Sequence, residues 1–565
     1  MRWRVIDPPP DPARIKDLAR DLEISPLLAT LLVQRGYDTP ERISFFLNPG
    51  LRYLNPLQDW PGVDHGADIL AQSVSRGEKI AVWGDYDVDG ITATALLKDF
   101  FCRRGVNVEH YIPGRLEEGY GLNPEGIKEL AGRGVHTLVT VDCGISSSEE
   151  VALARELGMQ VLITDHHLPG ETLPAAEAII NPKCGSCPCP ELAGVGVAFL
   201  LAAALNRRLE GAPVDIRDFL DLVALGSIAD VVELTGQNRV LVKNGLLLLN
   251  QPQRPGIQAL KEVCGLNNSN YLGSGQIGFG LAPRINAAGR LGNAEPALEL
   301  LLAEDGPTAR LKAAELDRMN QERRKLEESI LGEARELADS QKDRMGLVLY
   351  SPKWHHGVIG IVASRIVEEF NRPCLILARK GGLLKGSGRS VSGFDLFSGL
   401  SRISPVLHGF GGHTMAAGLS VAEKDLDELC TAFDRDVRGV LGDTPPEPEI
   451  VADARVGFRE LSPEFIRELE IMQPFGLGNS NPIFVSPPLE VQDMYLFGQN
   501  RHVGLELHDQ DSGLTFRGKI WRRGEQYREI NLKGKRAVVA YRPKMEEFKG
   551  LMSINLHINQ VLEIS

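Results

Sequence analysis

Long hydrophobic runs are missing from this 565-residue sequence. The longest apolar stretch, Leu192 to Leu205, is too short to span a bilayer and predicts a buried helix instead. The first residues, MRWRVIDPPPDPAR, lack the apolar core that a secretory signal carries. We therefore expect a protein that works in the cytoplasm and does not enter a membrane.

Cysteines arranged as expected for disulfide bonds are also scarce. Five of the eight cysteines stand alone inside apolar segments, as reduced core thiols of cytosolic proteins do. The other three, Cys184, Cys187 and Cys189, form a C-x2-C-x-C cluster in NPKCGSCPCP. A matching fourth ligand is not obvious nearby, so the cluster favours a Pro-rich surface loop, and a zinc site stays open as the alternative. The isolated cysteines are Cys102, Cys143, Cys264, Cys374 and Cys430.

An excess of positive charge is missing as well. The chain has 62 Lys and Arg against 75 Asp and Glu, a net charge of −13. This balance argues against a protein that coats duplex DNA, because the phosphate backbone favours cationic surfaces. It is compatible with a metal-dependent nuclease, which gathers acids at its site and confines basic residues to a groove.

One segment, residues 515–549, departs from this acidic background. It is rich in Arg and Lys and has aromatic residues interleaved among them. This mixture suits a single nucleic acid strand, whose charge the cations neutralise and whose bases stack on the aromatic rings. The alternative is a solvated edge of a small β domain. The interleaved aromatic residues are Trp521, Tyr527, Tyr541 and Phe548.

The order of apolar segments predicts the fold class. From about residue 78, apolar strands alternate with amphipathic helices, which indicates an α/β domain with a parallel sheet covered on both faces. A charged segment with apolar residues at Leu311, Ala314, Met319, Leu326 and Ile330 predicts a long connecting helix, followed by a second α/β domain and a small β-barrel. The predicted limits are 1–75 for an N-terminal helical extension, 76–300 for the first α/β domain, 301–345 for the connecting helix, 346–445 for the second α/β domain and 446–565 for the barrel.

Acidic residues gather where the predicted strands of the first domain end. The carboxyl ends of parallel strands share one rim of the sheet, where ligands bind. Two divalent ions at such a rim can hydrolyse a phosphoester, and they need several carboxylates, one of them shared. Mixed Asp and His ligands favour Mn²⁺ over Mg²⁺. The residues that meet this requirement are Asp85, Asp87 and Asp89 of WGDYDVDG, Asp142 of HTLVTVD, His166 of QVLITDHH, and Asp230.

Each of these residues also has a purely structural interpretation. Asp89 could cap a helix that begins at Gly90, and Asp165 could serve to orient a histidine. Neighbouring residues of an extended segment point to opposite sides, so His166 and His167 are not expected to bind the same ion. We expect one of them to bind metal and the other to face the substrate.

The motifs taken together resemble a known group of enzymes. Asp165–His166–His167 is the triplet for which the DHH phosphoesterase superfamily is named, and GDYDVDG, VDCGIS and ALGSIADVV resemble its other motifs in order. HGFGGHTMAAG resembles the glycine-rich motif of the associated DHHA1 domain. With PGRLEEGYGLN, LAGVGVAF and PRINAAGR, the chain resembles specifically the RecJ family of single-strand-specific exonucleases, over nearly its whole length.

This resemblance implies an activity and a set of ligands. The activity is 5′ to 3′ release of mononucleotides from single-stranded DNA with two Mn²⁺ or Mg²⁺ ions, in DNA repair and recombination. His167, with Asp142 and Asp165, is implied in catalysis, where His167 faces the scissile phosphate. A histidine of related phosphatases is replaced here by Trp83, so that Asp85 must supply that ligand. The implied metal ligands are Asp85 and Asp87 for one ion, Asp89, His166 and Asp230 for the other, and Asp142 between them.

Substrate-binding residues and partners follow from the same resemblance. The implied partners are single-stranded DNA, a helicase that unwinds its ends and a single-strand-binding protein. The barrel of this chain is implied to be an OB-like domain that binds the single strand. The implied substrate residues are Arg115, Ser387 and Arg389 for the 5′ phosphate, Tyr120 for base stacking, Arg284 and Arg290 for backbone or scissile phosphates, and His413 after a glycine pair.

Two other functions stay open at this point. The first is a DHH phosphodiesterase that acts on short oligonucleotides or cyclic dinucleotides, which would not need the final barrel. The second is a DNA-binding scaffold that has lost catalysis. Such a protein should also have lost some of the acidic residues that bind metal. The basic aromatic segment after residue 515 and the full set of acids favour the exonuclease.

Overall fold

The computed structural model describes residues 2–9, 11–266, 271–548 and 551–565. The chain forms two compact units. A larger unit comprises Asn55–Val232 and Gly245–Glu447, and a barrel unit comprises Met1–Leu54, Glu233–Asn244 and Pro448–Ser565. Within the described residues, none of the helices combines the length and the apolar character that crossing a membrane requires.

The first α/β domain lies in the larger unit and contains a five-stranded sheet in the order β3-β2-β4-β5-β6. All neighbouring strands are parallel, and Gly84, Val141 and Thr164 are paired across β2, β4 and β5. Because these three residues end their strands, the residue after each of them comes to the same rim. The strands are β2 Ile80–Gly84, β3 Glu109–Tyr111, β4 Thr137–Val141, β5 Gln160–Thr164 and β6 Ala178–Ile180.

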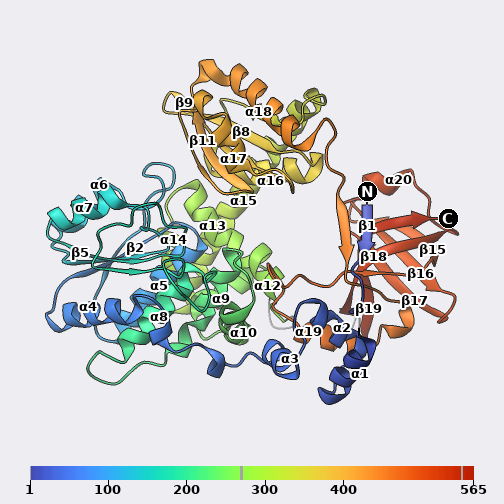
Figure 1. Cartoon of the computed structure of the whole chain (residues 1–565), viewed down its shortest axis with the longest axis horizontal. Helices are drawn as coiled ribbons and strands as arrows, with labels where there is room; N and C mark the ends of the chain where they lie inside the picture. Colours follow the sequence, from blue (N-terminus) through green and yellow to red (C-terminus); the bar gives the residue numbers. More distant parts are fainter. Residues whose placement is uncertain (1, 10, 267–270, 549–550) are drawn as a thin grey trace. The chain divides into compact units, whose positions relative to one another are not determined.

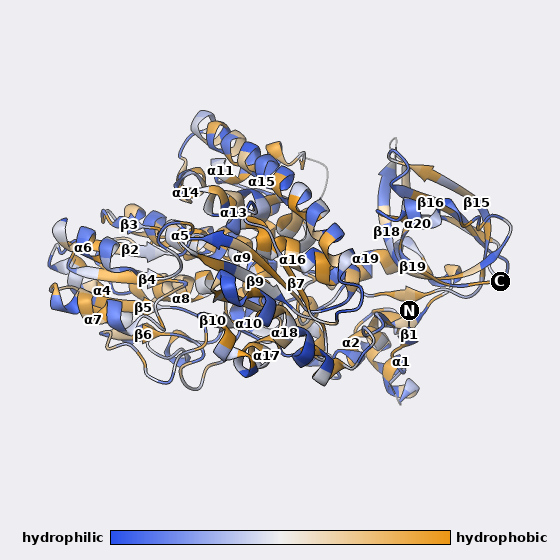
Figure 2. Ribbon diagram, turned by 90° about the horizontal axis from the view of Figure 1, so that it is seen from above, coloured by the Kyte–Doolittle hydropathy of each residue, from blue (hydrophilic) through white to orange (hydrophobic). Residues whose placement is uncertain are grey.

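Helices cover both faces of this sheet, as predicted. Figure 1 shows α6 and α7 on one face and α4, α5 and α8 on the other, and β4 and β5 are mostly hydrophobic in Figure 2. The predicted buried helix after Leu192 is confirmed as α8, which is buried along nearly its whole length. The helices are α4 Val63–Ser75, α5 Val88–Arg103, α6 Pro124–Gly132, α7 Ser148–Glu156, α8 Gly194–Asn206, α9 Leu220–Ala229, α10 Gly236–Asn250, α11 Pro255–Val263, α12 Ser274–Gln276, the π-helix η4 Ile277–Leu281, α13 Ala282–Leu291 and α14 Glu295–Leu302, with 3-10 turns η2 Leu57–Asp59 and η3 Ile216–Phe219.

The connecting helix is α15, Gly306–Ser340. Its predicted apolar face is correct only in part, because Ile330 is buried but Leu311 is 68% exposed and Leu326 is 37% exposed. The buried face follows Ala309, Leu316 and Ile330 and includes polar side chains. In Figure 2, hydrophilic and hydrophobic turns alternate along α15, as they do in a helix with one buried side.

The second α/β domain has a mixed sheet in the order β10-β11-β9-β8-β7. Its glycine-rich segments LLKGSGR and GFGG form strands. A Cβ at Gly386 would lie 2.3 Å from Leu377, and one at Gly388 would lie 2.7 Å from Leu375, so glycine allows these strands to pack tightly. The elements are β7 Leu347–Tyr350, α16 His356–Phe370, β8 Cys374–Lys380, β9 Leu383–Arg389, α17 Leu396–Arg402, η5 Ser404–Val406, β10 Gly409–Gly412, β11 Ala416–Val421, η6 Glu423–Asp425 and α18 Leu426–Leu441.

The barrel unit is built around a sheet that closes on itself through pairing of β18 with β19, and the predicted barrel is thereby confirmed. The N-terminal helices share its core, since Leu28 and Phe46 pack in one cluster with Leu489 and Tyr541. The elements are β1 Arg2–Val5, α1 Pro12–Asp21, α2 Pro26–Gln34, α3 Pro40–Leu47, η1 Leu51–Tyr53, β12 Glu449–Ala452, β13 Ala454–Arg455, η7 Phe458–Glu460, α19 Pro463–Ile471, β14 Phe484–Val485, β15 Leu489–Phe497, β16 His502–Asp509, β17 Leu514–Ile520, α20 Gly524–Arg528, β18 Arg536–Phe548 and β19 Leu551–Ile564.

The cysteines depart from the prediction in part. Cys143 and Cys374 are buried, but Cys102 is exposed, and Cys264 and Cys430 are only half-buried. Cys184, Cys187 and Cys189 lie in the loop that follows β6. They do not take part in the groups of potential metal ligands found among the described residues.

Candidate active site

Three acidic residues follow the ends of neighbouring strands. Asp85, Asp142 and Asp165 come directly after β2, β4 and β5, and each is at most 3% exposed. The strand register brings them together without any contribution from the loops. Gly90 is needed beside them, because a Cβ there would lie 2.6 Å from the backbone of Asp85 and would push α5 away from the strand end.

The two other acids of WGDYDVDG have separate tasks. Asp87, and not Asp89, caps α5: its carboxylate accepts hydrogen bonds from the backbone N–H groups of Asp89 (2.9 Å) and Gly90 (3.2 Å). The helix therefore begins at Val88, and the expected cap at Asp89 is wrong. The carboxylate of Asp89 instead accepts hydrogen bonds from the first N–H groups of α8, at Gly194 (2.7 Å) and Val195 (2.9 Å).

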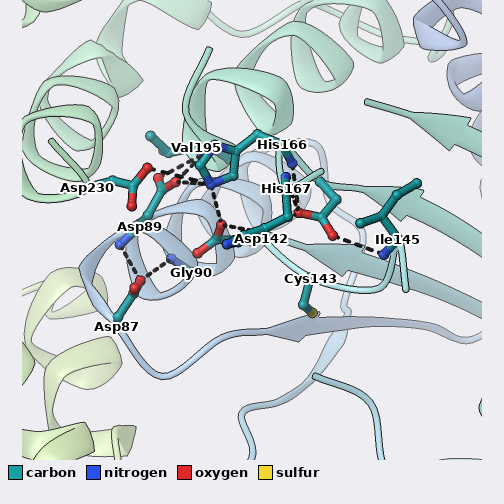
Figure 3. Close-up of polar contacts among 12 residues, drawn as sticks. Asp87, Asp89, Gly90, Asp142, Cys143, Ile145, His166, His167, Val195 and Asp230 are labelled. Atoms are coloured by element: carbon teal, nitrogen blue, oxygen red, sulfur yellow. Dashed lines mark hydrogen bonds and ion pairs between the residues drawn. The ribbon is translucent and has the colours of Figure 1, made fainter. Parts of the chain in front are cut away.

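His166 lies at the centre of the acidic group. Its Nε2 atom is 3.1 Å from Asp142 Oδ1, 3.5 Å from Asp230 Oδ2 and 3.8 Å from Asp89 Oδ2. Figure 3 shows these three carboxylates turned towards the His166 ring, although they come from α5, the end of β4 and the end of α9. Residues separated by 141 positions in the sequence thus meet at one point.

His167 lies in a chain of hydrogen bonds with Asp165 and Tyr120. Its Nδ1 atom is 2.8 Å from Asp165 Oδ1 and 3.1 Å from the Tyr120 hydroxyl. Asp165 also accepts hydrogen bonds from the backbone N–H groups of His166, His167 and Ile145. The two histidine rings are 4.6 Å apart, and both lie within reach of the Asp142 carboxylate. Their side chains therefore do not point to opposite sides as fully as the prediction for an extended segment requires.

The carboxylates of the cluster are buried and crowded, and nearby cations such as Lys183 and Arg115 offset their repulsion only in part. Burial and then neighbouring carboxylates raise the pKa of Asp89 to about 7 and the pKa of Asp230 to about 9, and hold the pKa values of Asp85 and Asp142 well above normal. Burial lowers the pKa of His166 to about 3, so its imidazole is neutral and able to act as a ligand.

The pair formed by Asp165 and His167 behaves in the opposite way. Burial would raise the pKa of Asp165, but the hydrogen bond from His167 lowers it, and Asp165 in turn raises the pKa of His167 against the effect of burial. Asp165 is therefore a carboxylate and His167 readily carries a proton. This proton lies beside the acidic cluster.

The residues present fit two divalent cations. Three buried atoms of the cluster, Asp85 Oδ1, Asp142 Oδ1 and His166 Nε2, make no hydrogen bond within the described residues. Leaving such atoms unsatisfied is costly, and cations would satisfy all three. Ligand atoms lie within 4.8 Å of one another in each of three groups: Asp85, Asp87 and Asp142; Asp89, His166 and Asp230; and Asp142, His166 and His167. Asp142 belongs to two of these groups.

A second cluster consists of arginines. Burial, then Arg115 and Arg323, lowers the pKa of Arg290 to about 10, and Arg389 adds to this repulsion. Arg389 donates a hydrogen bond to Ser387 Oγ (3.0 Å), and Arg115 lies over the ring of Tyr86. Crowded guanidinium groups of this kind favour phosphate binding.

Three of the predicted substrate residues have other surroundings. Arg284 donates a hydrogen bond to Asp317 (2.8 Å) and another to the carbonyl of Gly280, and thus ties α13 to α15 and to the π-helix. His413 is exposed in the turn between β10 and β11. The Tyr120 hydroxyl bonds to His167 and to the carbonyl of Asp142, which holds the ring at the edge of the metal cluster while half of the residue stays exposed.

Residues that sequence reasoning missed surround the metal cluster. Gly194 donates to Asp89, and a Cβ at this position would lie 2.8 Å from Asp142, so the residue fixes two acids at once. The segment LAGVGVAF signals this role, because glycines at the start of an apolar helix allow close approach. Lys183, which is half-buried, lowers the pKa of Asp230.

A separate cavity of about 730 Å³ lies in the same domain. It is lined by residues at the end of α5 and the start of α11, such as Lys98, Cys102 and Arg254. Its charged side chains pair with one another, because Arg254 donates to both Asp99 and Asp221. The lining contains none of the predicted site residues, so this cavity is not the active site.

Comparison with known families assigns each part of the chain. Residues 79–227 match the N-terminal domain of the DHH family, residues 344–439 match the DHHA1 domain, and residues 452–560 match the RecJ OB domain. These matches coincide with the first sheet, the second sheet and the barrel, and they confirm the predicted fold class.

Curated relatives resemble the chain over most of its length. The single-stranded-DNA-specific exonuclease RecJ of Escherichia coli (strain K12) is 37% identical over 96% of this chain and 96% of its own length. The enzyme of the same name from Bacillus subtilis (strain 168) is 38% identical over 91% of this chain, which spans 65% of that longer relative.

Solved structures agree with this assignment. The crystal structure of RecJ from Thermus thermophilus in complex with Mn²⁺ has a TM-score of 0.85 and 32% identity, and covers 100% of this chain and 79% of its own. The same protein was also solved with Mg²⁺ (TM-score 0.78, 30% identity, 100% of this chain and 78% of its own). These metals are the cations that the acidic cluster fits. From its domains, its relatives and its fold, the chain belongs to the RecJ family of single-stranded-DNA-specific exonucleases.

Proposed function

We propose that this chain is a metal-dependent exonuclease that degrades single-stranded DNA from the 5′ end and releases 5′-mononucleotides. The observation that carries the proposal is the group of Asp85, Asp89, Asp142, His166 and Asp230, in which three buried ligand atoms are unsatisfied and would fit two cations. Its relatives are named for the same activity on single strands.

The ligands divide between two cations. One ion would be held by Asp85, Asp87 and Asp142, and the other by Asp89, His166, Asp230 and the shared Asp142. Bound there, the cations would activate a water molecule for attack on the phosphodiester and neutralise the charge that develops on its oxygens.

The other residues bind, orient and move protons. Asp165 fixes the His167 ring and keeps it protonated, and His167 then has a proton to donate to an oxygen of the scissile phosphate or to the departing 3′ oxygen. The Tyr120 hydroxyl contacts the same Nδ1 atom of His167 and helps to hold the ring in place. Arg115, Ser387 and Arg389 would bind the terminal phosphate, and Arg290 would bind the phosphate beside it.

The barrel offers a surface for the rest of the strand. Trp521 is 46% exposed and contacts Phe497, His502 and His557 edge-on. Of the other aromatic residues expected to stack, Tyr527 and Tyr541 are buried in the core, which corrects that expectation, and the side chain of Phe548 lies outside the described residues. We therefore assign base stacking to the Trp521 cluster.

Digestion of end-labelled strands tests the activity. With Mn²⁺, a 5′ label on single-stranded DNA should appear in mononucleotides from the first turnover, whereas a 3′ label should stay in long fragments until late. Chelator should abolish both. Matched duplex and a dinucleotide are the control substrates. A clear preference for the dinucleotide would favour the short-oligonucleotide phosphodiesterase, and early release of the 3′ label would contradict the polarity.

Replacing Trp521 with Ala tests the strand-binding surface. We expect affinity for a long single strand to fall about tenfold, because one base loses its stacking partner, while turnover of a dinucleotide stays unchanged. Trp521→Phe is the matched control and should keep most of the affinity. Fluorescence anisotropy with a labelled strand measures both variants, and equal affinity of the Ala variant and the parent would contradict the assignment.

The cellular context is also part of the proposal. The enzyme would work in the cytoplasm, in DNA repair and recombination, on ends opened by a helicase and on strands covered by a single-strand-binding protein. The activity of relatives on single strands supports this setting, because such strands must first be exposed.

A further inference from the structure

A buried polar stripe runs along one side of α15. Asn320, Arg323 and Glu327 are 1%, 7% and 5% exposed, and their spacing of three and four residues places them on one face. Charged residues are rarely buried without a specific partner, since burial costs them their hydration. A plain connecting helix has no need of such a stripe.

Hydrogen bonds hold the guanidinium of Arg323 in one orientation. Its Nε and Nη2 atoms donate to Asn320 Oδ1 (3.2 and 2.9 Å), and its Nη1 atom donates to Glu327 Oε2 (2.9 Å). The other carboxylate oxygen of Glu327 accepts a hydrogen bond from Arg365 of α16 (2.8 Å). Two guanidinium groups thus share one carboxylate, so the three side chains carry one net positive charge, with Arg323 buried and Arg365 42% exposed.

This charge lies behind the arginine cluster of the active site. Arg323 is among the groups that lower the pKa of Arg290, together with Arg115 and Arg389. The first turns of α16 contact the same cluster: Arg290 donates to the carbonyl of Gly357 (3.1 Å), and a Cβ at Gly360 would lie 3.0 Å from Ser387 Oγ and 3.2 Å from Arg389 Nη2. Helices α13, α15 and α16 contact one another here (Figure 1).

The arginines of the cluster have acidic neighbours, since Asp87 raises the pKa of Arg290, but they are not neutralised by direct pairing. Within the described residues, the side chains of Arg115, Arg290 and Arg389 make no ion pair with a carboxylate, and the carboxylate of Glu327 is already shared. Guanidinium groups that repel one another at this distance are stabilised when an anion lies among them. The cluster is therefore built to be completed by phosphate.

We propose that Arg323 is a positioning residue for the terminal phosphate: fixed by Asn320 and Glu327, it keeps a buried positive charge behind Arg290 and sets the preference for a 5′-phosphorylated strand. This rests on the proposed function, because the phosphate is that of the strand end. Arg323 need not touch the strand. It acts through the field at the phosphate and through the Glu327–Arg365 link, which holds α16 against Ser387 and Arg389.

The variant Asn320→Asp tests this role with the least disturbance. Asp has nearly the shape of Asn, so Arg323 keeps its hydrogen bonds, but the new carboxylate neutralises its charge. A unit charge about 10 Å from a phosphate contributes on the order of a tenfold change in affinity at the dielectric constant typical of such sites. We expect the preference for 5′-phosphorylated over 5′-hydroxyl strands to fall about tenfold.

The measurement is equilibrium binding of the two strands without turnover. Fluorescence anisotropy in chelator gives the two dissociation constants, and their ratio is the readout. Ser329→Asp is the control, because it also adds one negative charge to α15 but places it on the exposed face of the helix; its ratio should stay within about twofold of the parent. Arg323→Gln should lower the ratio as Asn320→Asp does, and Arg323→Lys should restore part of it.

The outcomes separate this inference from the proposed function. An equal loss of affinity for both strands in Asn320→Asp and Arg323→Gln would mean that the stripe is only structural, and the proposal would be overturned. An unchanged ratio in both folded variants, or no preference in the parent, would overturn it as well. Failure of the exonuclease activity itself would appear as absent hydrolysis in the parent protein with Mn²⁺, which the binding ratio does not depend on.

Discussion

Replacing Asp142 with Asn is expected to lower the rate of strand hydrolysis by about three orders of magnitude or more, while strand binding stays within about twofold. Asp142 belongs to two of the three potential metal groups, and we expect it to lie between the two ions. Its backbone φ of 62° directs it into the cluster from the end of β4. Asn keeps the shape of the side chain but supplies one weaker ligand atom without charge.

The same substitution has a second consequence for the metal-free protein. Because burial and the neighbouring acids hold the pKa of Asp142 well above normal, removing this carboxylate relieves repulsion. The metal-free Asn variant should therefore unfold at a higher temperature than the parent at pH 8. Single-turnover digestion with Mn²⁺, anisotropy and thermal unfolding together measure the three effects.

A carboxylate outside the cluster provides the control. Asp218 is exposed and pairs with Arg103, so Asp218→Asn should leave hydrolysis unchanged. Hydrolysis by Asp142→Asn within about tenfold of the parent would contradict the bridging role. A parallel loss of strand binding would indicate that Asp142 shapes the substrate site and does not only bind metal.

The sequence predicts the metal cluster well because local rules determine most of it. Alternating strands and helices define a parallel sheet, and the residues after Gly84, Val141 and Thr164 must then share one rim. The position of Asp230 depends on α9, whose apolar length is also visible in the sequence. For these residues, the structure supplies the distances, but their placement at one rim already follows from the sequence.

Other parts could not be predicted, because they depend on contacts between distant segments. Nothing near Arg284 in the sequence indicates its hydrogen bond to Asp317, which removes it from the free phosphate-binding groups. Apolar periodicity likewise missed the buried face of α15, where Arg323 and Glu327 replace the apolar residues that define an ordinary amphipathic helix. Buried polar networks are invisible to a rule that searches for apolar stripes.

The barrel unit illustrates the same limit at a larger scale. Short strand-like runs predict the barrel, but they do not indicate that Leu28 and Phe46, more than 400 residues before the last strands, complete its core. Arg239 of α10 is fully buried there and donates to the carbonyls of Phe46 and Met472. Removing the residues after 447 would therefore expose this core, which is why a single substitution at Trp521 is the better test of strand binding.

The stability of the metal-free protein should depend on pH in an unusual direction. Asp89 and Asp230 have folded pKa values of about 7 and about 9, above the ordinary carboxyl value of 3.8. Between the ordinary carboxyl value and each folded pKa, the folded state binds more protons than the unfolded state. The stability of the folded state therefore falls as pH rises through that range. The raised pKa of His167 acts in the same direction, because its proton is also held more tightly in the folded state.

His166 opposes this trend only at lower pH. Its folded pKa of about 3 lies below the ordinary histidine value of 6.5, so its contribution rises with pH between those values and is complete above them. Above pH 6.5 the carboxyls with raised pKa and His167 determine the slope within this cluster. From pH 6.5 to 9, Asp230 by itself should cost the metal-free protein roughly 3 kcal/mol, at about 1.4 kcal/mol for each pH unit.

Divalent cations should reverse this dependence. In chelator, we expect the unfolding temperature to fall steadily from pH 6.5 to 9. With saturating Mn²⁺ it should rise or stay level over the same range, because the ions compete with protons for the same carboxylates and bind more tightly as those protons leave. The gap between the two curves should therefore be widest near pH 9. Asp230→Asn should flatten the metal-free curve, since it removes a carboxyl whose pKa is raised, and Asp218→Asn should not. A metal-free unfolding temperature that is constant or rising above pH 6.5 would mean that the acids are not crowded as described, and would remove the main physical argument for a two-ion site.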